Sequence, residues 1–414
     1  MDIIIGAGIS GLAYAAFRQD TDLLVLEADD RIGGYCKTTL RNGFVWDYSG
    51  HFFHFRNPEI KDFVMAGIPS EHLLTVRKNT RIRYKDRWVD YPFQKNIHQL
   101  EKEEFIDCLY DLFSAGGPYE TFREMLYAKF GRSIAEKFLC PYNEKLYACD
   151  LETLDKDAMG RFFPYADPLE VVRNFRKKDA SAYNETFIYS RYGAGSFVQS
   201  VASRVPAERI RTGVRVTAVD TARHQVRLDT GECLEYDNLV STVPFPKLLA
   251  LCGIPYEPSL YSGNQVIVFN LGFDTKGPDT TDHWIYYPEP QYCFYRVGFY
   301  DNILGQGRTS LYVELGFPAD AEIDAEAMLP TVLADLVVAG AIDPGQRLVD
   351  YETIRMNPAY VHVNGASTRD VVEKKRSLAF DDIYSIGRYG SWCYCSIEDN
   401  ILEARDLADK MKRR

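Results

Sequence analysis

The sequence predicts an α/β fold with three parts: a doubly wound parallel sheet, a helical insert and an antiparallel sheet. Three observations support this prediction. An apolar run at residues 3–5 leads into a glycine-rich turn and a helix-like segment. Residues 101–180 show the helical spacing of apolar side chains, whereas residues 210–317 contain stretches, one of them at 224–244, that alternate as strands do and are expected to be antiparallel. No repeat or linker separates these patterns, so the parts are expected to be interleaved.

The N-terminal segment has the features of a dinucleotide-binding unit. The stretch GAGISG (6–11) joins the first strand to a helix, and a second strand, LLVLE, ends at Glu27. Gly6 allows the tight turn, Gly8 lets the backbone approach a pyrophosphate, and Gly11 allows the helix to contact the strand. The Glu27 carboxylate can accept both ribose hydroxyls and would repel a 2′-phosphate.

Composition and charge argue against several classes of protein. The 48 basic and 59 acidic residues give a net charge of -11, and no long Lys/Arg run offers a surface for nucleic acid. Nine scattered Cys residues without paired ligand spacing indicate a reduced, cytoplasmic protein. No metal is expected, because nothing at ligand spacing completes a pair formed by His51 and His54. No apolar stretch reaches the length of a membrane span, so a soluble protein is expected.

Three segments together resemble the amine oxidase-like, glutathione reductase-type FAD proteins. They are EADDRIGGYCKT (27–38), GVRVTAV (213–219) and a C-terminal strand, loop and helix that begins at DDIYSIG (381–387). The resemblance implies FAD as cofactor in a Rossmann-like domain. The cofactor residues that it implies are Gly6, Gly8, Ser10, Gly11, Glu27, Ala28, Arg31, Gly33, Gly34, Gly50, His51, Val216, Gly387, Arg388, Asp399 and Asn400.

A narrower resemblance, to the eukaryotic-type branch of the UDP-galactopyranose mutase family, spans nearly the whole chain. It is carried by DYSGHFFHF (47–55), YPFQKNI (91–97), KFLCPYNEKLYA (137–148), WIYYPEPQYCFYR (284–296) and GRYGSWCYCSIEDN (387–400). The resemblance implies a mutase that interconverts pyranose and furanose forms of a nucleotide sugar. In such an enzyme N5 of the reduced flavin attacks the anomeric carbon, and NAD(P)H is a possible reductant.

The family match also implies a diphosphate site. Arg296 and Arg161 are carried over as the two clamps on the diphosphate, although either arginine could instead form a surface ion pair. Tyr360, Tyr394 and Tyr286 correspond to phenols that hydrogen-bond to phosphate. Both arginines are expected to be catalytic, together with Tyr360 and Tyr394.

The same match implies a nucleoside site and a flavin contact. His51, also expected to be catalytic, lies in the loop that contacts the isoalloxazine in the family, where we expect a hydrogen-bonding group rather than a proton carrier. Cys393 and Cys395 flank Tyr394 and are expected to be packing thiols. The residues expected at the nucleoside, for which packing is the alternative, are Tyr91, Phe93, Gln94, Asn143 and Tyr147.

We expect a discontinuous FAD-binding domain at 1–78, 190–255 and 340–414, a helical insert at 98–180, and a substrate domain at 79–97 and 256–339. The expected partner is a nucleotide-diphosphate sugar. Departures from the family pattern, such as Asn302-Ile303 and Glu398-Asp399-Asn400, leave the sugar and the base open. Two other functions also stay open: an FAD-dependent oxidoreductase of the amine oxidase or phytoene desaturase type, and a flavin-binding scaffold or sensor.

Overall fold

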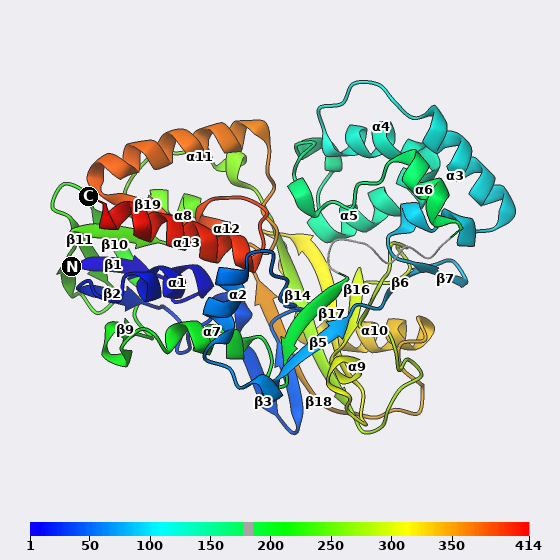
Figure 1. Ribbon diagram of the computed structural model, residues 1–414, viewed down its shortest axis with the longest axis horizontal. Coiled ribbons are helices and arrows are strands. Elements are labelled where there is room, and N and C mark those ends of the chain that lie inside the picture. Colours follow the sequence, from blue (N-terminus) through cyan, green and yellow to red (C-terminus); the bar gives the residue numbers. More distant parts are fainter. Residues whose placement is uncertain (177–184, 414) are drawn as a thin grey trace.

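A five-stranded parallel sheet brings together the two ends and the middle of the chain (Figure 1). The computed structural model describes residues 1–176 and 185–413. The strand order is β19-β13-β1-β2-β9, so segments that are far apart in the sequence form one sheet. The strands are β1 (Asp2–Ile5), β2 (Leu23–Leu26), β9 (Ile210–Arg211), β13 (Asn238–Ser241) and β19 (Ile383–Ser385).

Both faces of the parallel sheet are covered. On one face Ile4 packs with the helices α1 (Ile9–Phe17), α7 (Gly195–Ala202) and α13 (Ile397–Lys412). On the other face Ile3 and Ile5 pack with a small sheet and with two further helices. These elements are β10 (Val216–Asp220), β11 (Gln225–Leu228), β12 (Cys233–Glu235), α8 (Phe245–Leu251) and α11 (Gly365–Leu378). The doubly wound sheet predicted from the N-terminal pattern is therefore confirmed.

One strand was assigned to the wrong kind of sheet. The stretch that contains β13 was expected to form antiparallel strands with its neighbours, but β13 pairs in parallel with both β1 and β19. Leu239 and Val240 are fully buried, as the middle of an α/β sheet requires. Because a short apolar run fits either kind of sheet, the pattern alone could not separate the two possibilities.

A seven-stranded sheet forms the second layer, in the order β18-β14-β17-β16-β15-β6-β7. All neighbouring pairs are antiparallel except β15 and β6, which are parallel. Strand β14, which lies between β18 and β17, is buried along its whole length. The strands are β6 (Thr80–Tyr84), β7 (Arg87–Asp90), β14 (Asn264–Phe273), β15 (Trp284–Tyr286), β16 (Arg296–Phe299), β17 (Ser310–Pro318) and β18 (Leu348–Met356).

Strand β18 pairs with β14 from Leu348 to Met356, on the far side of the boundary expected at residue 340. The boundary would have placed this strand in the FAD-binding domain. Pairing between strands about 80 residues apart leaves no local mark in the sequence, because it depends on which edge the returning chain meets.

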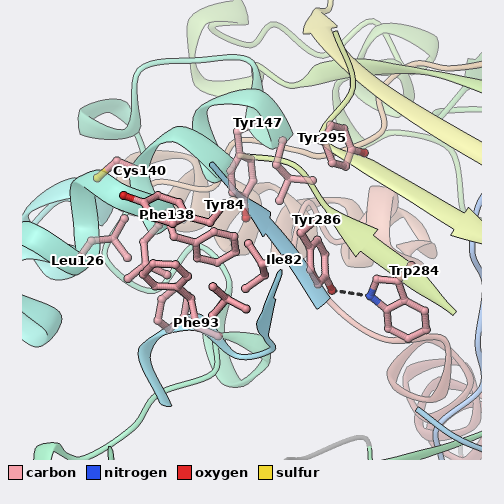
Figure 2. Packing of buried hydrophobic residues seen from close by; sticks show 14 of the residues in the cluster. Ile82, Tyr84, Phe93, Leu126, Phe138, Cys140, Tyr147, Trp284, Tyr286 and Tyr295 are labelled. Atoms are coloured by element: carbon pink, nitrogen blue, oxygen red, sulfur yellow. Dashed lines mark hydrogen bonds between the residues drawn. The ribbon is translucent and has the colours of Figure 1, made fainter. Parts of the chain in front are cut away.

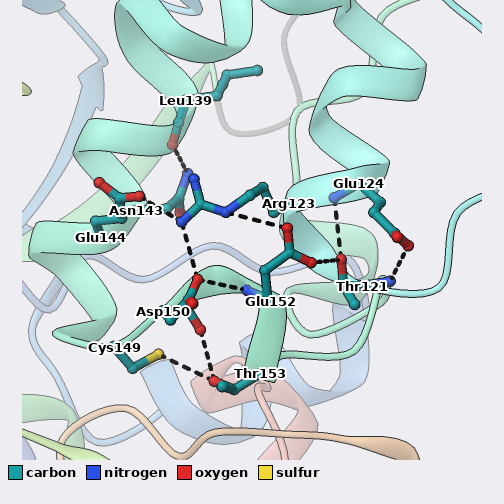
Figure 3. A network of polar contacts seen from close by, with 10 residues as sticks. All are labelled: Thr121, Arg123, Glu124, Leu139, Asn143, Glu144, Cys149, Asp150, Glu152 and Thr153. Carbon is teal, nitrogen blue, oxygen red and sulfur yellow. Dashed lines mark hydrogen bonds and ion pairs between the residues drawn. The ribbon is translucent and has the colours of Figure 1, made fainter.

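The helical insert begins with α3 (Lys102–Ser114) and stands apart from the parallel sheet (Figure 1). Its expected last residues, 177–180, lie outside the described residues. Within the insert the Arg123 guanidinium contacts the carboxylates of Glu144, Asp150 and Glu152, which ties its short helices together (Figure 3). The remaining helices are α4 (Phe122–Ile134), α5 (Cys140–Tyr147) and α6 (Pro168–Asn174), with a π-helical turn at Ala135–Leu139.

Several shorter elements connect the layers. In the described ranges, no helix is both long and apolar enough to cross a membrane. No group of three or more His, Cys, Asp or Glu side chains suited to a metal ion occurs in those ranges either. The elements that connect the layers are β3 (Thr38–Arg41), β4 (Phe44–Asp47), β5 (Leu73–Arg77), β8 (Thr186–Ser190), α2 (Pro58–Met65), α9 (Tyr300–Leu304), α10 (Ala325–Val338) and α12 (Gly387–Gly390).

The largest apolar cluster lies between the insert and the seven-stranded sheet (Figure 2). Phe93 stacks on Phe138 with ring centroids 5.2 Å apart. Tyr147 and Tyr286 belong to the same cluster and come from the insert and the sheet respectively. Packing in this cluster therefore fixes the position of side chains that the sequence assigned to a substrate site.

The turn between β1 and α1 depends on close contact between backbone atoms. Gly6 has a φ of 102°, which favours glycine. A Cβ atom at Gly11 would lie 2.1 Å from the carbonyl oxygen of Gly6 and 3.1 Å from Cγ2 of Ile4. The helix can therefore approach the strand only because position 11 has no side chain.

Gly11→Ala should lower the free energy of unfolding by about 1–3 kcal/mol, because the methyl group meets backbone that cannot move aside. At an unconstrained helical position, by contrast, replacing glycine by alanine raises the free energy of unfolding. Gly307→Ala is the matched control, since no atom lies within 4 Å of its Cβ position. Chemical denaturation followed by circular dichroism measures both variants, and equal stabilities would contradict the close-packing argument.

Candidate functional site

A cavity of about 630 Å³ opens beside the glycine turn that follows β1. It extends from the end of β2 to the loop that precedes α13, so its wall comes from segments at both ends of the chain. A volume of this size suits a cofactor or a substantial ligand. The predicted cofactor residues in the wall are Gly6, Gly8, Ser10, Glu27, Ala28, Gly33, Gly34, His51, Val216, Gly387, Arg388 and Asn400.

Four predicted cofactor residues lie outside this wall. Gly11 packs beneath the turn, and Gly50 lies against the ring of Tyr312. Arg31 is exposed, and its Nη2 lies 3.3 Å from the Tyr48 hydroxyl. Asp399 caps α13 by accepting a hydrogen bond from the backbone N–H of Ser396 at 2.8 Å. The structure thus brings most of the predicted set together, but not these four.

The glycine end of the cavity fits a dinucleotide. No side chain caps the N-terminus of α1, so its first N–H groups are available to an anion. The nearest atom to a Cβ at Gly8 would be the Cα of Gly34, at 3.9 Å, so any larger side chain would grow into the cavity. Glu27 accepts hydrogen bonds from the N–H groups of Ala7 at 2.7 Å and Asp29 at 2.9 Å. These bonds hold the carboxylate in the wall of the cavity.

His51 is held as a neutral ring at the other end of the cavity. Burial lowers the pKa of His51 to about 4. Its Nδ1 lies 3.1 Å from the Ser49 carbonyl oxygen. Because a carbonyl can only accept, the neutral ring carries its proton on Nδ1 and leaves Nε2 as an acceptor. This arrangement agrees with a hydrogen-bonding role.

Arg296 does not stand alone in the site. Its Nε and Nη2 each lie 2.7 Å from an oxygen of Glu314, forming a bidentate pair. Glu314 is 1% exposed, and its carboxylate also accepts a hydrogen bond from Ser49 Oγ. Sequence reasoning missed Glu314, although a carboxylate inside the apolar strand SLYVELGFP was a possible signal. The pair links the predicted clamp to the loop that carries His51.

Arg161 occupies a different position. Its Nη2 lies 2.5 Å from Oδ1 of Asp399, and its guanidinium lies 4.8 Å from the ring of Phe162. It lines a separate surface hollow and not the large cavity. Phe162 nevertheless contacts the Tyr394 ring, with centroids 5.4 Å apart. Within the described residues, Arg161 thus pairs with Asp399, whereas Arg296 pairs with Glu314.

Phenol rings gather around a second guanidinium, that of Arg388. The rings of Tyr360 and Tyr394 stack with centroids 6.0 Å apart, and Tyr147 meets Tyr360 edge-on at 5.8 Å. The Arg388 guanidinium lies 4.5 Å from the Tyr394 centroid and 5.2 Å from that of Tyr360. Arg296 and Arg388 both lower the pKa of Tyr360, although burial raises it overall. Tyr360 therefore lies near two cations, and Tyr394 lies against one of them.

A lysine missed by sequence reasoning joins this group. Lys78 Nζ lies 5.2 Å from the Tyr91 ring centroid and 5.9 Å from that of Trp284. Burial lowers the pKa of Lys78 to about 8. Among the described residues no carboxylate pairs with it. The Trp284 indole also donates to the Tyr286 hydroxyl at 2.8 Å (Figure 2), so one of the two rings near Lys78 is bonded to a predicted phosphate phenol.

Four of the five predicted nucleoside residues are buried and Tyr91 is partly exposed; three of the buried ones carry polar atoms that lack a partner among the described residues. Asn143 donates through Nδ2 to the Leu139 carbonyl oxygen at 2.7 Å (Figure 3). Its Oδ1, the Oε1 of Gln94 and the hydroxyl of Tyr147 have no hydrogen-bond partner within the part of the chain that the structure describes. Phe93 lies in the apolar core. Unpaired buried polar atoms are costly unless a ligand satisfies them.

Three comparisons with known proteins bear on this site. The model of the family described as flavin containing amine oxidoreductase matches residues 9–340. A corticosteroid-binding protein of Candida albicans is 25% identical over 295 residues, covering 62% of this chain and 55% of that protein. The chloroplastic protoporphyrinogen oxidase 1 of Arabidopsis thaliana is 27% identical over 191 residues, covering 38% of this chain and 33% of that protein. The matched part of the chain thus spans about half the length of the first relative and about a third of the length of the second.

Among solved structures, a crystal structure of reduced UDP-galactopyranose mutase superposes with a TM-score of 0.91. The two chains are 24% identical, and the superposition covers 100% of this chain and 93% of the other. This likeness concerns the fold. The mixed α/β architecture expected from the sequence is therefore confirmed.

His51→Gln should flatten the pH dependence of stability of the flavin-free protein. The pKa of His51 is about 4 when folded, against 6.5 for an unperturbed histidine. As the pH falls below 6.5 the unfolded chain binds the proton first, so His51 costs the folded state stability. Between pH 7 and 5 the free energy of unfolding should fall by about 1–2 kcal/mol more in the wild type than in the variant. Denaturant curves at each pH test this, and parallel losses would contradict it.

Proposed function

We propose that this chain, a member of the flavin containing amine oxidoreductase family, is a flavin-dependent mutase that interconverts pyranose and furanose forms of a nucleotide sugar. UDP-galactose, or a closely related sugar nucleotide, is the proposed substrate. The coarser conclusion, a flavin-binding member of this family, rests on the family match. The mutase activity is the further step, and the likeness of fold to a UDP-galactopyranose mutase supports it.

The observation that carries the proposal is the group of phenols and cations near the flavin-type cavity. Arg388, Tyr360 and His51 line the cavity. The Tyr394 ring stacks on that of Tyr360, and the charge of Arg296 lowers the pKa of Tyr360. Guanidinium groups and phenolic hydroxyls are the donors that a diphosphate requires, whereas oxidation of an amine or a hydrocarbon needs no such group.

The proposed mechanism assigns separate tasks to these side chains. The reduced flavin, when bound, supplies the nucleophile for the anomeric carbon of the sugar. Tyr360 and Tyr394 donate to oxygens of the diphosphate, and Arg388 and Arg296 balance its charge when it leaves and returns. His51 supplies a fixed acceptor at Nε2 without changing its charge. Because Glu314 already occupies the Arg296 fork, the diphosphate must share or replace that pairing.

The nucleoside is proposed to bind against the helical insert. The unpaired Oε1 of Gln94, Oδ1 of Asn143 and hydroxyl of Tyr147 offer acceptors for the N–H of a uracil or for ribose hydroxyls. Tyr91 and Tyr147 offer ring faces for stacking. Arg161 is proposed to reach the diphosphate by exchanging its pairing with Asp399. NAD(P)H is proposed as one possible reductant.

A redox enzyme of the amine oxidase type is the second candidate. It is favoured by the similarity to a protein named protoporphyrinogen oxidase 1, chloroplastic. An enzyme of that type would consume an electron acceptor stoichiometrically and would not need the cation group. Product analysis therefore separates the two candidates.

Anaerobic incubation with dithionite and UDP-galactofuranose should give UDP-galactopyranose, detected by chromatography of the nucleotide sugars. Conversion should require reduced flavin, so the same protein with oxidised flavin is the control. No conversion of either isomer by flavin-loaded, reduced protein would rule out this sugar pair. Stoichiometric consumption of O₂ with another substrate would favour the redox enzyme.

Lys78→Met should raise the KM for the nucleotide sugar by about tenfold and change kcat much less, because an unpaired cation is lost from the binding site. Methionine preserves the length of the side chain and its contact with the rings of Tyr91 and Trp284. Lys61→Met, on the exposed side of α2, is the matched control. Equal KM values for the two variants would remove Lys78 from the substrate site.

A further inference from the structure

Helix α5 ends against the seven-stranded sheet, and its last two residues, Leu146 and Tyr147, are buried. Ala148, whose φ is 52°, terminates the helix, and the carbonyl oxygens of the last turn need partners from outside it. At Gly316 of β17 a Cβ atom would lie 2.2 Å from the Lys145 carbonyl oxygen. The helix end and the sheet are therefore in direct backbone contact.

Two buried side chains supply partners for the last two carbonyl groups of the helix. Nδ2 of Asn264 donates to the Leu146 carbonyl oxygen at 2.6 Å, and Nε2 of His362 lies 2.9 Å from the Tyr147 carbonyl oxygen. Because a carbonyl can only accept, the neutral His362 ring carries its proton on Nε2. Its Nδ1 then accepts from Ser262 Oγ at 3.1 Å. With Asn264 0% and His362 6% exposed, both side chains are fixed in orientation.

The same two residues hold the segment that carries Tyr360. Oδ1 of Asn264 accepts from the Tyr360 N–H at 2.7 Å, and the backbone N–H of Asn264 donates to the Tyr360 carbonyl oxygen at 2.9 Å. His362 follows Tyr360 by two residues, and its backbone N–H donates to the Ser262 carbonyl oxygen at 2.9 Å. Asn264 and His362 therefore join the end of the helical insert to the segment of Tyr360.

This junction places two phenol rings side by side. The centroids of the Tyr147 and Tyr360 rings lie 5.8 Å apart. The Tyr147 hydroxyl has no hydrogen-bond partner among the described residues, whereas Tyr360 lines the large cavity, where the Arg388 guanidinium lies 5.2 Å from its ring. A ring contact tolerates sliding, but a hydrogen bond restricts donor and acceptor to about 2.7–3.2 Å. The two bonds to the helix end therefore restrict the separation of the rings more tightly than ring packing does.

We propose that Asn264 and His362 are positioning residues that set the separation between the Tyr147 and Tyr360 rings and so match the site to a nucleoside diphosphate. The inference rests on the proposed function, in which Tyr147 meets the nucleoside and Tyr360 the diphosphate. Neither positioning residue contacts the ligand, and both act through the two tyrosines. Loss of either bond to the helix end lets the insert shift, so that the nucleoside and the diphosphate no longer fit at the same time.

A matched pair of substitutions at His362 tests the role of its Nε2–H. Methionine and glutamine have side chains of equal length, but only glutamine can donate a hydrogen bond from the position of Nε2. His362→Met should raise the KM for the nucleotide sugar by about tenfold and change kcat by less than about threefold, because the misplaced rings weaken binding. His362→Gln should keep both constants within about threefold of the wild type. Equal KM values in the two variants would overturn the proposal.

Two further variants separate positioning from stability. Arg204 donates at 2.6 Å to the Phe63 carbonyl oxygen in the last turn of α2, away from the phenols. Arg204→Met is the matched control: it removes a bond to a helix carbonyl and should lower the midpoint of thermal unfolding but leave the KM unchanged. Ser262→Ala keeps His362 but removes the partner of its Nδ1, and should raise the KM by about threefold. A wild-type KM in both Ser262→Ala and His362→Met would reduce the two bonds to helix capping and overturn the proposal.

A second measurement needs no nucleotide sugar. In crystal structures of the flavin-loaded variants, the Tyr147 and Tyr360 rings should lie about 1 Å further apart in His362→Met than in His362→Gln, a displacement large enough to impair binding. Equal separations would overturn the proposal. If the rings separate as expected but the reduced wild type converts no nucleotide sugar, the mutase proposal fails and the positioning of the rings stands.

Discussion

The buried carboxylate of Glu314 is the interaction on which the site depends. A charge that is 1% exposed is stable only when paired and hydrogen-bonded, and here the Arg296 fork and the Ser49 hydroxyl supply those partners. Ser49 belongs to the loop that carries His51, whereas Glu314 and Arg296 lie on adjacent strands of the seven-stranded sheet. One carboxylate therefore fixes the loop of His51 to the seven-stranded sheet. It also prevents Arg296 from being an uncompensated buried cation before an anion binds.

The wall of the cavity carries charges of both signs. Glu27 follows β2 and is held there by two backbone N–H groups. The cationic side chains in the wall are those of Arg215, Lys247 and Arg388. Lys247 lies close enough to Glu27 and Arg215 for both charges to affect its pKa, whereas Arg388 lies against the Tyr360 and Tyr394 rings. Within the described ranges, a single carboxylate therefore stands among several cations, which suits a cavity that takes an anionic ligand.

What the sequence predicted well depends on neighbouring residues, and what it missed depends on distant ones. The glycine turn and Glu27 were identified because strand, turn, helix and carboxylate follow one another within 27 residues. Glu314 and Lys78 acquire their meaning only from partners brought together by folding: Arg296 and Ser49 for the first, two aromatic rings for the second. The parallel pairing of β13 and the position of β18 have the same origin. Arg161 was matched to the diphosphate by its motif, but its pairing with Asp399 depends on the far end of the chain.

The segment between Tyr286 and Arg296, one of those that carried the narrower resemblance, has its length fixed by Lys145. Its Nζ lies 2.9 Å from the carbonyl oxygens of Tyr287, Glu289 and Tyr292, and it also donates to that of Phe294. The turn between β15 and β16 thus wraps around a partly buried ammonium, and loss of solvation lowers the pKa of Lys145 to about 8. Adding or removing one residue in the turn would displace several carbonyls and leave polar groups unpaired in the interior. The ammonium therefore fixes the length of the turn, and with it the placement of a phenol and a guanidinium on adjacent strands.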